Sequence, residues 1–375
     1  MKEGWIYKKL GEVCDLYQPK TISTKEMVAD GKYDVFGANG VIGKYNQYNH
    51  EQPEVLMTCR GATCGNINVS TPKSWINGNA MVIHIKDHSV LDKSYLVYAL
   101  SHIDKRHIIT GAAQPQITRQ TLAPLSFLFP PLSEQRAIVS RLDASFAHID
   151  ALKANAVKQL SDAKALFQKA LTEAMEPKEG WEEKKLGDLG EFKNGMNFAH
   201  NERGYDLFLL GVGDFGNLFS INDVKKLSKI SLNRKPAEEY LLHNGDIVFV
   251  RSNGNKQLVG RSLVVYPNDI HVTFSGFCIR FRRKTNIINE KFLVSYLKSE
   301  NTRNKLFGNG TNISNLNQKL LQNIIVPVPP LSEQQRIVER LDELSEKVKK
   351  LEEIQEKTIK ECDALKQAIL REVFE

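Results

Sequence analysis

Four polar loops in the sequence carry side chains that can hydrogen-bond to the edges of DNA bases. "CRGATCGN" (59–66) and "VRSNGNKQLVGR" (250–261) each begin at the end of a short apolar run that is typical of a strand. "TGAAQPQITRQ" (110–120) and "GNGTNISNLNQK" (308–319) repeat the same chemistry further along the chain. Arg and Asn make bidentate contacts to guanine and adenine in the major groove. A single loop of this kind is usually a polar turn, whereas matched pairs with differing residues favour a surface that reads sequence.

We predict that these loops and a few neighbouring side chains bind DNA. Lys and Arg would contact phosphates and supply affinity, and the groups that reach base edges would supply specificity. The predicted DNA-binding residues are Arg60, Thr63, Asn66, Asn79, Gln114, Gln116, Thr118, Arg119, Lys193, Asn194, Arg251, Asn253, Asn255, Lys256, Arg261, Asn309, Asn312, Ser314 and Asn315.

The basic charge of the chain is concentrated in the segments that hold these loops. Residues 1–131 carry 14 Lys and Arg against 11 Asp and Glu, and residues 177–330 carry 22 against 15. Residues 132–176 carry 6 of each, and residues 331–375 carry 9 against 12. A basic excess confined to the loop-bearing segments fits a polyanionic partner. The excess is too small for a protein that binds through charge alone.

The sequence shows no motif for catalysis or for a cofactor. It contains no GxxxxGK[ST] phosphate loop and no [DN]PP[YF] run of the kind that amino-methyltransferases use. The five cysteines and nine histidines show no metal-ligand spacing. Asp246, near Lys256, is interpreted as the end of a turn before a strand and not as part of a nuclease centre. We therefore expect a protein that is not an enzyme and that itself binds no cofactor or metal.

Composition indicates an ordinary globular chain. Its 375 residues are 41% hydrophobic and 25% charged, and this length suits two or three domains. No apolar run approaches the roughly 20 residues that span a bilayer. The opening "MKEGWIYKKL" lacks the apolar centre of a signal peptide. We expect a cytoplasmic protein with reduced cysteines.

One pattern occurs twice in the chain. "PPLSEQRAIVSRLD" (130–143) and "PPLSEQQRIVERLD" (329–342) share 11 of 14 positions, and "GWIYKKLG" at Gly4 resembles "GWEEKKLG" at Gly180. Between these motifs, Arg60 aligns with Arg251 and Ile117 with Ile313. The offset between the copies grows from 176 to 199 residues, as expected when the second copy has longer loops. This predicts a globular unit followed by a tail, twice: residues 1–131, 132–176, 177–330 and 331–375.

Each tail is predicted to be one long helix. Ser133 and Ser332 are expected at the N-cap, with Glu134 and Glu333 in the first turn, where the helix dipole favours an anion. Apolar residues then recur at alternating steps of three and four, and about 40 residues pass without Gly or Pro, enough for a helix of about 60 Å. The residues assigned to the helix pair and to partner docking are Ile138, Leu142, Ile149, Leu152, Ile337, Leu341, Leu344, Val348, Leu351 and Leu365.

The two tails are expected to pair with each other. Units related by a twofold-like rotation would make the helices run antiparallel, so that two globular ends are held apart by a two-helix coiled coil. The alternative is that each helix packs on its own globular unit. It accounts poorly for apolar seams that persist along both tails.

The motifs together resemble the specificity subunit of Type I restriction-modification systems. The resemblance covers nearly the whole chain and is most specific at the two "PPLSEQ" motifs, at the "W…KKLG" starts of Trp5 and Trp181, and at "FVRSNGN" (249–255). It implies two tandem α/β target recognition domains, each reading one half of a split, asymmetric double-stranded DNA target. "MTCRGATCGN" (57–66) departs from the more typical "VFVRSNGN" of the second copy, which blurs the contact assignments in the first.

The resemblance also implies the partners. Two adenine methyltransferase (modification) subunits would dock on the helices, and a restriction/translocase subunit would complete the complex. S-adenosylmethionine, ATP and Mg would belong to those subunits. Three alternatives stay open: a self-contained DNA enzyme, a coiled-coil scaffold without a DNA role, and the specificity subunit of a related restriction system outside Type I.

Overall fold

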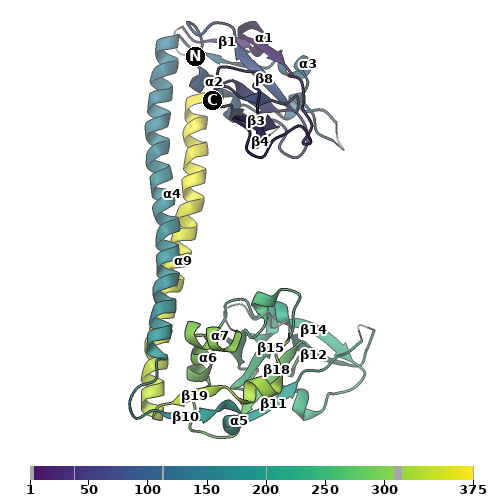
Figure 1. Cartoon of the computed structure of the whole chain (residues 1–375), viewed down its shortest axis with the longest axis vertical. Helices are drawn as coiled ribbons and strands as arrows, with labels where there is room; N and C mark the ends of the chain where they lie inside the picture. The colour runs from purple at the N-terminus through teal and green to yellow at the C-terminus, as the bar shows by residue number, and fades with distance from the viewer. Residues whose placement is uncertain (1–3, 38, 112–113, 200, 308–314, 375) are drawn as a thin grey trace. The chain divides into compact units, whose positions relative to one another are not determined.

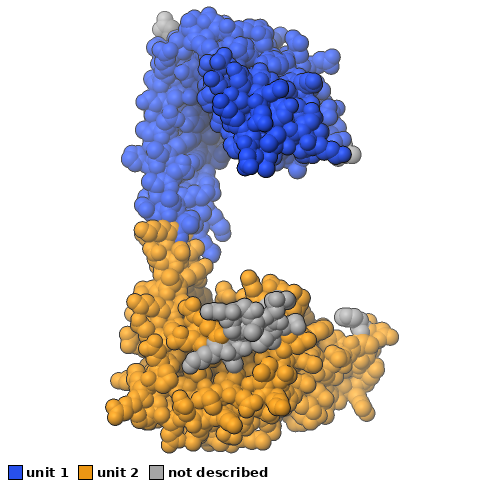
Figure 2. Space-filling view, viewed as in Figure 1, with its two compact units in different colours: residues 1–157, 356–375 blue, residues 158–355 orange. Residues whose placement is uncertain are grey.

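The computed structural model describes residues 4–37, 39–111, 114–199, 201–307 and 315–374. The chain divides into two compact units, which Figure 2 colours separately. Unit 1 comprises residues 1–157 and 356–375, and unit 2 comprises residues 158–355. Each unit therefore contains a globular body and a part of each of two long helices, α4 (Leu132–Ala174) and α9 (Leu331–Phe374).

The body of unit 1 is built on two small sheets. The first has the strand order β2-β8-β5-β6, and the second has the order β4-β3-β7 with β3 and β7 parallel. All four residues of β5 are buried, which explains why "VLMT" reads as a continuous apolar run and not as an alternating one. The strands are β2 (Cys14–Tyr17), β3 (Tyr33–Gly37), β4 (Gly40–Tyr45), β5 (Val55–Thr58), β6 (Ile67–Val69), β7 (Trp75–Ile76) and β8 (Ala80–Ile85).

The body of unit 2 repeats this topology. One sheet has the order β11-β18-β15-β16-β13 and the other has the order β14-β12-β17, with β12 and β17 parallel. The strand without a counterpart in unit 1 is β13 (Ser220–Ile221), which pairs with β16. The other strands are β11 (Gly190–Asn194), β12 (Tyr205–Leu210), β14 (Ser228–Leu232), β15 (Asp246–Val250), β16 (Ser262–Val265), β17 (Val272–Phe274) and β18 (Cys278–Arg283).

Short helices complete both bodies (Figure 1). Their capping residues fix the alignment of the two copies. Asp92 caps α2 (Lys93–His102), and Asn289 caps α6 (Glu290–Lys298). Thr118 caps α3 (Arg119–Leu122), and Asn317, 199 residues later, caps α8 (Gln318–Gln322). The alignment of Ile117 with Ile313 is therefore wrong, because the residue before the second cap is Leu316. The remaining helices are α1 (Leu10–Val13), α5 (Leu186–Leu189) and α7 (Glu300–Phe307).

The two long helices pack side by side and antiparallel in both units. In unit 1, Lys153 contacts Asp363 at 2.6 Å and Lys366 contacts Asp150 at 2.5 Å, so one helix ascends as the other descends. In unit 2, Lys164 lies 3.5 Å from Glu352. There, Gln355 also donates a hydrogen bond to Gln159 at 2.9 Å. The antiparallel two-helix pairing predicted from the sequence is confirmed.

The helix seam is narrower than the sequence predicts. Most of the assigned residues are buried or half-buried, but Leu152 is 57% exposed and Leu365 is 48% exposed. These two leucines are therefore not buried between the helices, and their assignment to partner docking stays a prediction. The buried positions of α4 recur once per heptad, at residues 142, 149, 156 and 163. Two helices alone cover only a narrow stripe of each other, and the second apolar position of the heptad lies beyond it.

The start of each long helix also differs from the prediction. Helix α4 begins at Leu132, and the N–H of Gln135 donates to the carbonyl of Pro131 at 3.0 Å. Ser133 therefore lies in the first turn and not at the N-cap, and Ser332 lies likewise in α9. A proline tolerates a helix start, since its missing N–H would have no partner there.

Each long helix also packs on the globular cores. The alternative to helix pairing, in which each helix packs on its own globular unit, is therefore partly correct. The core of unit 1 includes Leu142 from the start of α4 and Leu370 from the end of α9. The core of unit 2 includes Leu341 from the start of α9, with Leu171 and Met175 at the end of the α4 segment. Both arrangements therefore hold, because each unit is closed by the beginning of one helix and the end of the other.

Candidate nucleic-acid interface

Three polar segments of unit 1 meet at the end of β5. The N–H of Cys59 donates to the carbonyl of Asn79 at 3.2 Å, and the N–H of Ile117 donates to the carbonyl of Cys59 at 2.9 Å. Arg60 then forms an isolated bridge with Gln116. The loops that the sequence places about 50 residues apart thus form one surface, held by backbone hydrogen bonds that leave the side chains available.

This surface, which we call the unit 1 loop cluster, presents exposed polar side chains. The first loop turns back through Gly65, whose φ of +93° suits glycine. One further side chain, Asn39 at the tip of the β3–β4 hairpin, accepts a hydrogen bond from the amide of Asn66 at 3.3 Å. Asn39 was not among the predicted residues, because nothing nearby in the sequence marks it. The exposed members predicted from the sequence are Arg60, Thr63, Asn66, Asn79 and Gln116.

Unit 2 builds the corresponding surface with the same backbone bonds. The N–H of Arg251 donates to the carbonyl of Phe277 at 2.7 Å, and the N–H of Leu316 donates to the carbonyl of Arg251 at 2.8 Å. Ser252 forms an isolated bridge with Asn315. We call this the unit 2 loop cluster; its described members predicted from the sequence are Arg251, Asn253, Asn255, Arg261 and Asn315.

The backbone bonds correct the alignment of the two arginines. Arg251 holds the place that Cys59 holds in unit 1, and Arg60 corresponds to Ser252. The predicted match between Arg60 and Arg251 is therefore wrong by one residue, and in an extended segment one residue changes the face on which a side chain lies. Cys59 is fully buried and Arg60 is exposed. Arg251 is half-buried, with its guanidinium donating to the carbonyl of Gly276 at 3.5 Å.

Several predicted DNA-binding side chains are engaged within the protein. Lys193 contacts Glu239 at 2.6 Å and lies over the ring of Tyr240. Asn194 accepts a hydrogen bond from Gln318. Asn253 and Asn255 accept hydrogen bonds from backbone N–H groups two residues further on. Thr118 caps a helix. Each of these side chains therefore makes a contact within the protein.

The remaining predicted residues fall into three groups. Gln114 and Arg119 are exposed beside the unit 1 loop cluster. Lys256 is the first residue of a short 3-10 helix. Asn309, Asn312 and Ser314 lie outside the described residues.

The two most specific motifs of the sequence contact each other in both units. The indole N–H of Trp5 donates to Glu134, and that of Trp181 donates to Glu333 at 3.1 Å. Beside each contact, β1 (Ile6–Lys9) pairs with β9 (Ser126–Phe129), and β10 (Glu182–Lys185) pairs with β19 (Ile325–Val328). The glutamates therefore fasten each body to its helix, a role that the sequence analysis did not assign.

A buried glutamine completes each junction. Gln334 is fully buried and accepts a hydrogen bond from the N–H of Asn289, the cap of α6, at 2.7 Å. Its amide donates to the carbonyls of Ile287 and Pro329 at 2.8 and 2.7 Å. Gln135 makes the same three bonds in unit 1. Its repetition in both copies of "PPLSEQ" was a signal that the sequence analysis overlooked.

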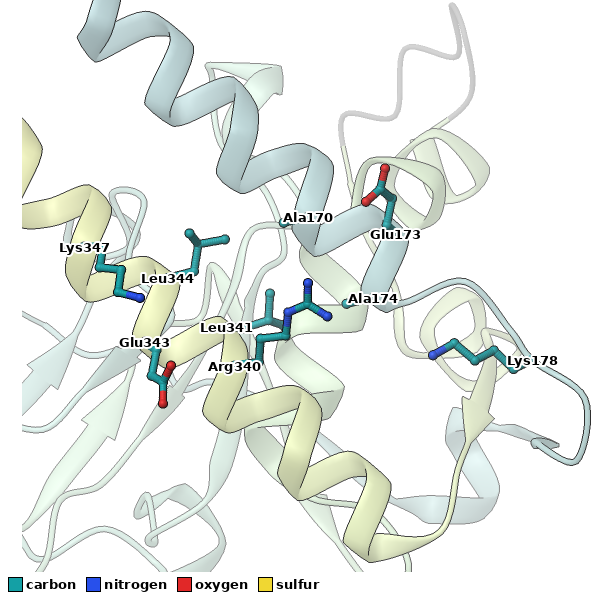
Figure 3. A pocket seen from close by; sticks show the side chains of 9 residues that line it. All are labelled: Ala170, Glu173, Ala174, Lys178, Arg340, Leu341, Glu343, Leu344 and Lys347. Carbon is teal, nitrogen blue, oxygen red and sulfur yellow. The ribbon is translucent and has the colours of Figure 1, made fainter.

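In unit 2 a groove beside the helix pair is lined by both apolar and charged side chains (Figure 3). The groove has a volume of about 380 Å³ and lies between the end of α4 and the beginning of α9. Leu341 and Leu344, both assigned to the helices from the sequence, contribute to its lining. Its other lining residues are Ala170, Glu173, Ala174, Lys178, Arg340, Glu343 and Lys347.

Acidic and thiol groups of the described residues have structural explanations. Asp246 lies at the start of β15 and is clamped by Arg282, with N–O distances of 2.8 and 2.7 Å. Burial raises the pKa of the Cys59 thiol to about 11, which leaves it protonated at neutral pH. Within the described ranges, no group of His, Cys, Asp and Glu could hold a metal ion, and no helix is long and apolar enough to cross a membrane.

Comparisons with known proteins agree on one family. The family model described as "Type I restriction modification DNA specificity domain" matches residues 2–161 and 178–361. The Type I restriction enzyme StySPI specificity subunit of Salmonella potsdam is 27% identical, over 90% of this chain and 72% of that protein. The MjaVIII specificity subunit of Methanocaldococcus jannaschii is 25% identical, over 90% of this chain and 85% of that protein.

Solved structures share the fold. The HsdS subunit of Thermoanaerobacter tengcongensis superimposes with a TM-score of 0.60 at 21% identity, over 100% of this chain and 97% of that one. A chain solved in work on complex assembly and conformational transition of the type I R-M system gives a TM-score of 0.76 at 20% identity, over 99% and 97%. The described fold, two tandem mixed α/β bodies that each pack on an antiparallel helix pair, is the one these structures share.

The family model answers the question of class that the sequence left open. A domain defined by DNA specificity agrees with the prediction of a non-catalytic recognition subunit. It speaks against both a self-contained DNA enzyme and a scaffold without a DNA role. Because the match extends over both units and both helices, the chain belongs to the Type I restriction modification DNA specificity domain family.

Proposed function

We propose that the chain is the DNA-recognition subunit of a Type I restriction-modification complex and that each unit reads one half of a split double-stranded DNA target. One observation carries this proposal: the same backbone hydrogen bonds build a loop cluster in both units, while the side chains on the two clusters differ. A shared backbone arrangement that presents different side chains suits two half-sites of different sequence. The target is therefore asymmetric.

The basic surplus of the two bodies supports the contact with DNA. Surface Lys and Arg contact phosphates and supply most of the affinity, whereas exposed Arg60 and its neighbours contact base edges and supply specificity. The bases between the half-sites are not read. The helices α4 and α9 set the number of those bases.

The helices are also the docking surface for two methyltransferase subunits. Apolar side chains that a two-helix pair leaves uncovered support this assignment, because a partner helix would bury them. Leu152 and Leu365 in unit 1 and Leu166 and Ile354 in unit 2 are each about half exposed. S-adenosylmethionine belongs to these partners, and ATP and Mg belong to a restriction/translocase subunit. The assembled complex acts in the cytoplasm.

Replacing Arg60 with Ala is expected to weaken recognition of one half-site only. Loss of an Arg contact to a base edge costs roughly 10- to 100-fold in binding, confined to the bases that the unit 1 loop cluster reads. Binding of the chain with its methyltransferase is measured against duplexes randomised in one half-site or the other. Arg106→Ala is the matched control, because it removes the same side chain from the same unit where Asp104 already holds it. Equal losses at both half-sites would contradict the assignment of one unit to one half-site.

Adding one heptad to each long helix is expected to lengthen the unread gap and leave both half-site sequences unchanged. Seven residues extend a helix by about 10 Å, or about three base pairs, and turn it by only about 20°. The insertions belong between the Lys153–Asp363 and Lys164–Glu352 ion pairs, at one level of the antiparallel pair. Sequencing of methylated adenines made by the complex reports the gap. An unchanged gap would refute the role of the helices as a spacer.

A further inference from the structure

Unit 2 contains a second cavity, larger than the groove of Figure 3 and different in chemistry. It has a volume of about 670 Å³, within the range of ligand-binding cavities. One wall is the loop before β13, with Gly216, Leu218 and Phe219, and the other is formed by the helix pair. Phe167 of α4 meets Phe219 edge to face at 5.8 Å.

Cations converge on this cavity. Lys298 at the end of α6, Arg261 before β16 and Arg303 in α7 all line it. The ammonium of Lys298 donates to the carbonyls of Leu218 at 2.6 Å and Ser262 at 3.3 Å, and it lies 4.6 Å from the ring centre of Phe219. The Arg261 guanidinium donates to the carbonyl of Gly216 at 2.6 Å. Carbonyls and a ring face hold Lys298 and Arg261 in place, and neither kind of contact neutralises a positive charge.

Carboxylates are scarce around the cluster. Glu352 is the one acidic residue among those that line the cavity, and Lys164 already pairs with it. In the part of the chain that the structure describes, neither Lys298 nor Arg261 has a carboxylate within 4 Å. Burial, together with the charges of Arg303 and Arg261, lowers the pKa of Lys298 to about 8. Positive charges held close together are stabilised when an anion binds among them.

Unit 1 lacks this cluster at the equivalent positions. Arg261 corresponds to Asn66, because the carbonyls of both residues accept the same backbone hydrogen bond from the neighbouring strand. Counting from the caps of α2 and α6, Lys298 corresponds to Ser101. The wall that carries Phe219 belongs to the region of β13, the strand without a counterpart in unit 1. The cationic cavity is therefore not required by the shared fold.

We infer that this cavity of unit 2 binds a phosphate ester, with Lys298 and Arg261 at the anion and exposed Lys349 at the mouth. A phosphate accepts several hydrogen bonds at once from cationic donors. The apolar wall of Phe167, Phe219 and Leu218 accommodates the sugar or base that the phosphate carries. The ester comes either from the backbone of bound DNA or from a free nucleotide. The inference does not depend on which bases unit 2 reads.

Binding of inorganic pyrophosphate, ATP and a short duplex to the full chain tests the inference by calorimetry at two salt concentrations. Lys298→Met should weaken the phosphate probes at least about tenfold. Lys349→Glu, which alters only an exposed side chain at the mouth, should weaken them several-fold even if Lys298→Met destabilises the loop. Lys350→Glu is the matched control, because it changes the net charge equally one residue away and does not line the cavity.

The probes also distinguish the two sources of phosphate. If DNA is the ligand, Lys298→Met and Lys349→Glu weaken duplex binding, lower its salt dependence by about one counterion, and pyrophosphate competes with the duplex. If a free nucleotide is the ligand, the same variants lose ATP and keep duplex affinity. The inference is overturned if no probe distinguishes Lys349→Glu from Lys350→Glu and Lys298→Met binds every probe like the unaltered chain. Neither result bears on the half-site specificity tested with Arg60.

Discussion

Replacing Asp246 with Ala is expected to lower the unfolding free energy of unit 2 by about 3–5 kcal/mol. The carboxylate is 2% exposed, accepts two hydrogen bonds from Arg282, and accepts a third from the N–H of His243 at 2.7 Å. Removing one partner of a buried ion pair leaves the other charge without compensation, which costs far more than the intact pair contributes. Thermal or urea unfolding of the full chain, followed by circular dichroism, measures the change.

The control for Asp246 lies in the same unit. Asp269 is exposed and makes no ion pair among the described residues, so Asp269→Ala should change the unfolding free energy by less than about 0.5 kcal/mol. Equal unfolding midpoints for the two variants would show that the Arg282 contact does not stabilise unit 2. A large loss of DNA cleavage or methylation with an unchanged midpoint would instead reopen a chemical role for Asp246.

Replacing Gln334 with Ala is expected to cost unit 2 about 2–4 kcal/mol. The substitution leaves the N–H of Asn289 and the carbonyls of Ile287 and Pro329 buried without their partner, and each unsatisfied group costs about 1–3 kcal/mol before relaxation. The cost falls on the junction between the body of unit 2 and helix α9. Unfolding of unit 2 should shift while unit 1, which has its own Gln135, keeps its transition.

The adjacent residue supplies the comparison. Gln335 is exposed on α9, and its amide donates to Glu339 one turn further on, so Gln335→Ala should be nearly neutral. Hydrogen exchange at the N-terminus of α6 gives an independent readout, because Gln334 accepts the N–H of its cap. Similar exchange in the two variants would mean that the glutamine does not hold the junction.

The order of bodies and long helices along the chain could be predicted, because the sequence motifs that mark them are local and occur twice. The two "PPLSEQ" motifs, their spacing and the long stretches without Gly or Pro predict two bodies and two helices. The fine structure of the seam could not be predicted. Leu152 continues the apolar pattern as well as Ile149 does, and only the width of the stripe that a second helix covers separates them.

The loops that form the candidate site could be predicted from their residue types, but the residue-by-residue alignment of the two copies could not. The loops at 59–66 and 110–120 were chosen for their side chains, and the structure brings them together. The match of Arg60 with Arg251 was wrong because it paired two residues of the same type, whereas the backbone hydrogen bonds pair Arg251 with Cys59. Asn39 was missed because its proximity to Asn66 arises from the hairpin of a different sheet, and such contacts leave no trace in local sequence.

The closing of unit 1 by the end of α9 has a consequence for the order in which the protein is made. Leu370 is 6% exposed in the core of unit 1, and the ring of Phe374 lies 5.6 Å from that of Tyr95. A ribosome delivers these residues more than 200 positions after Leu142, roughly 10–40 s later at ordinary rates of synthesis. Unit 2 has no such delay, because Leu171 and Met175 precede its body. The nascent chain therefore exposes the apolar surface of unit 1 that α9 later covers throughout the translation of unit 2. The two units have the same topology, but we expect only unit 1 to need protection by chaperones during synthesis.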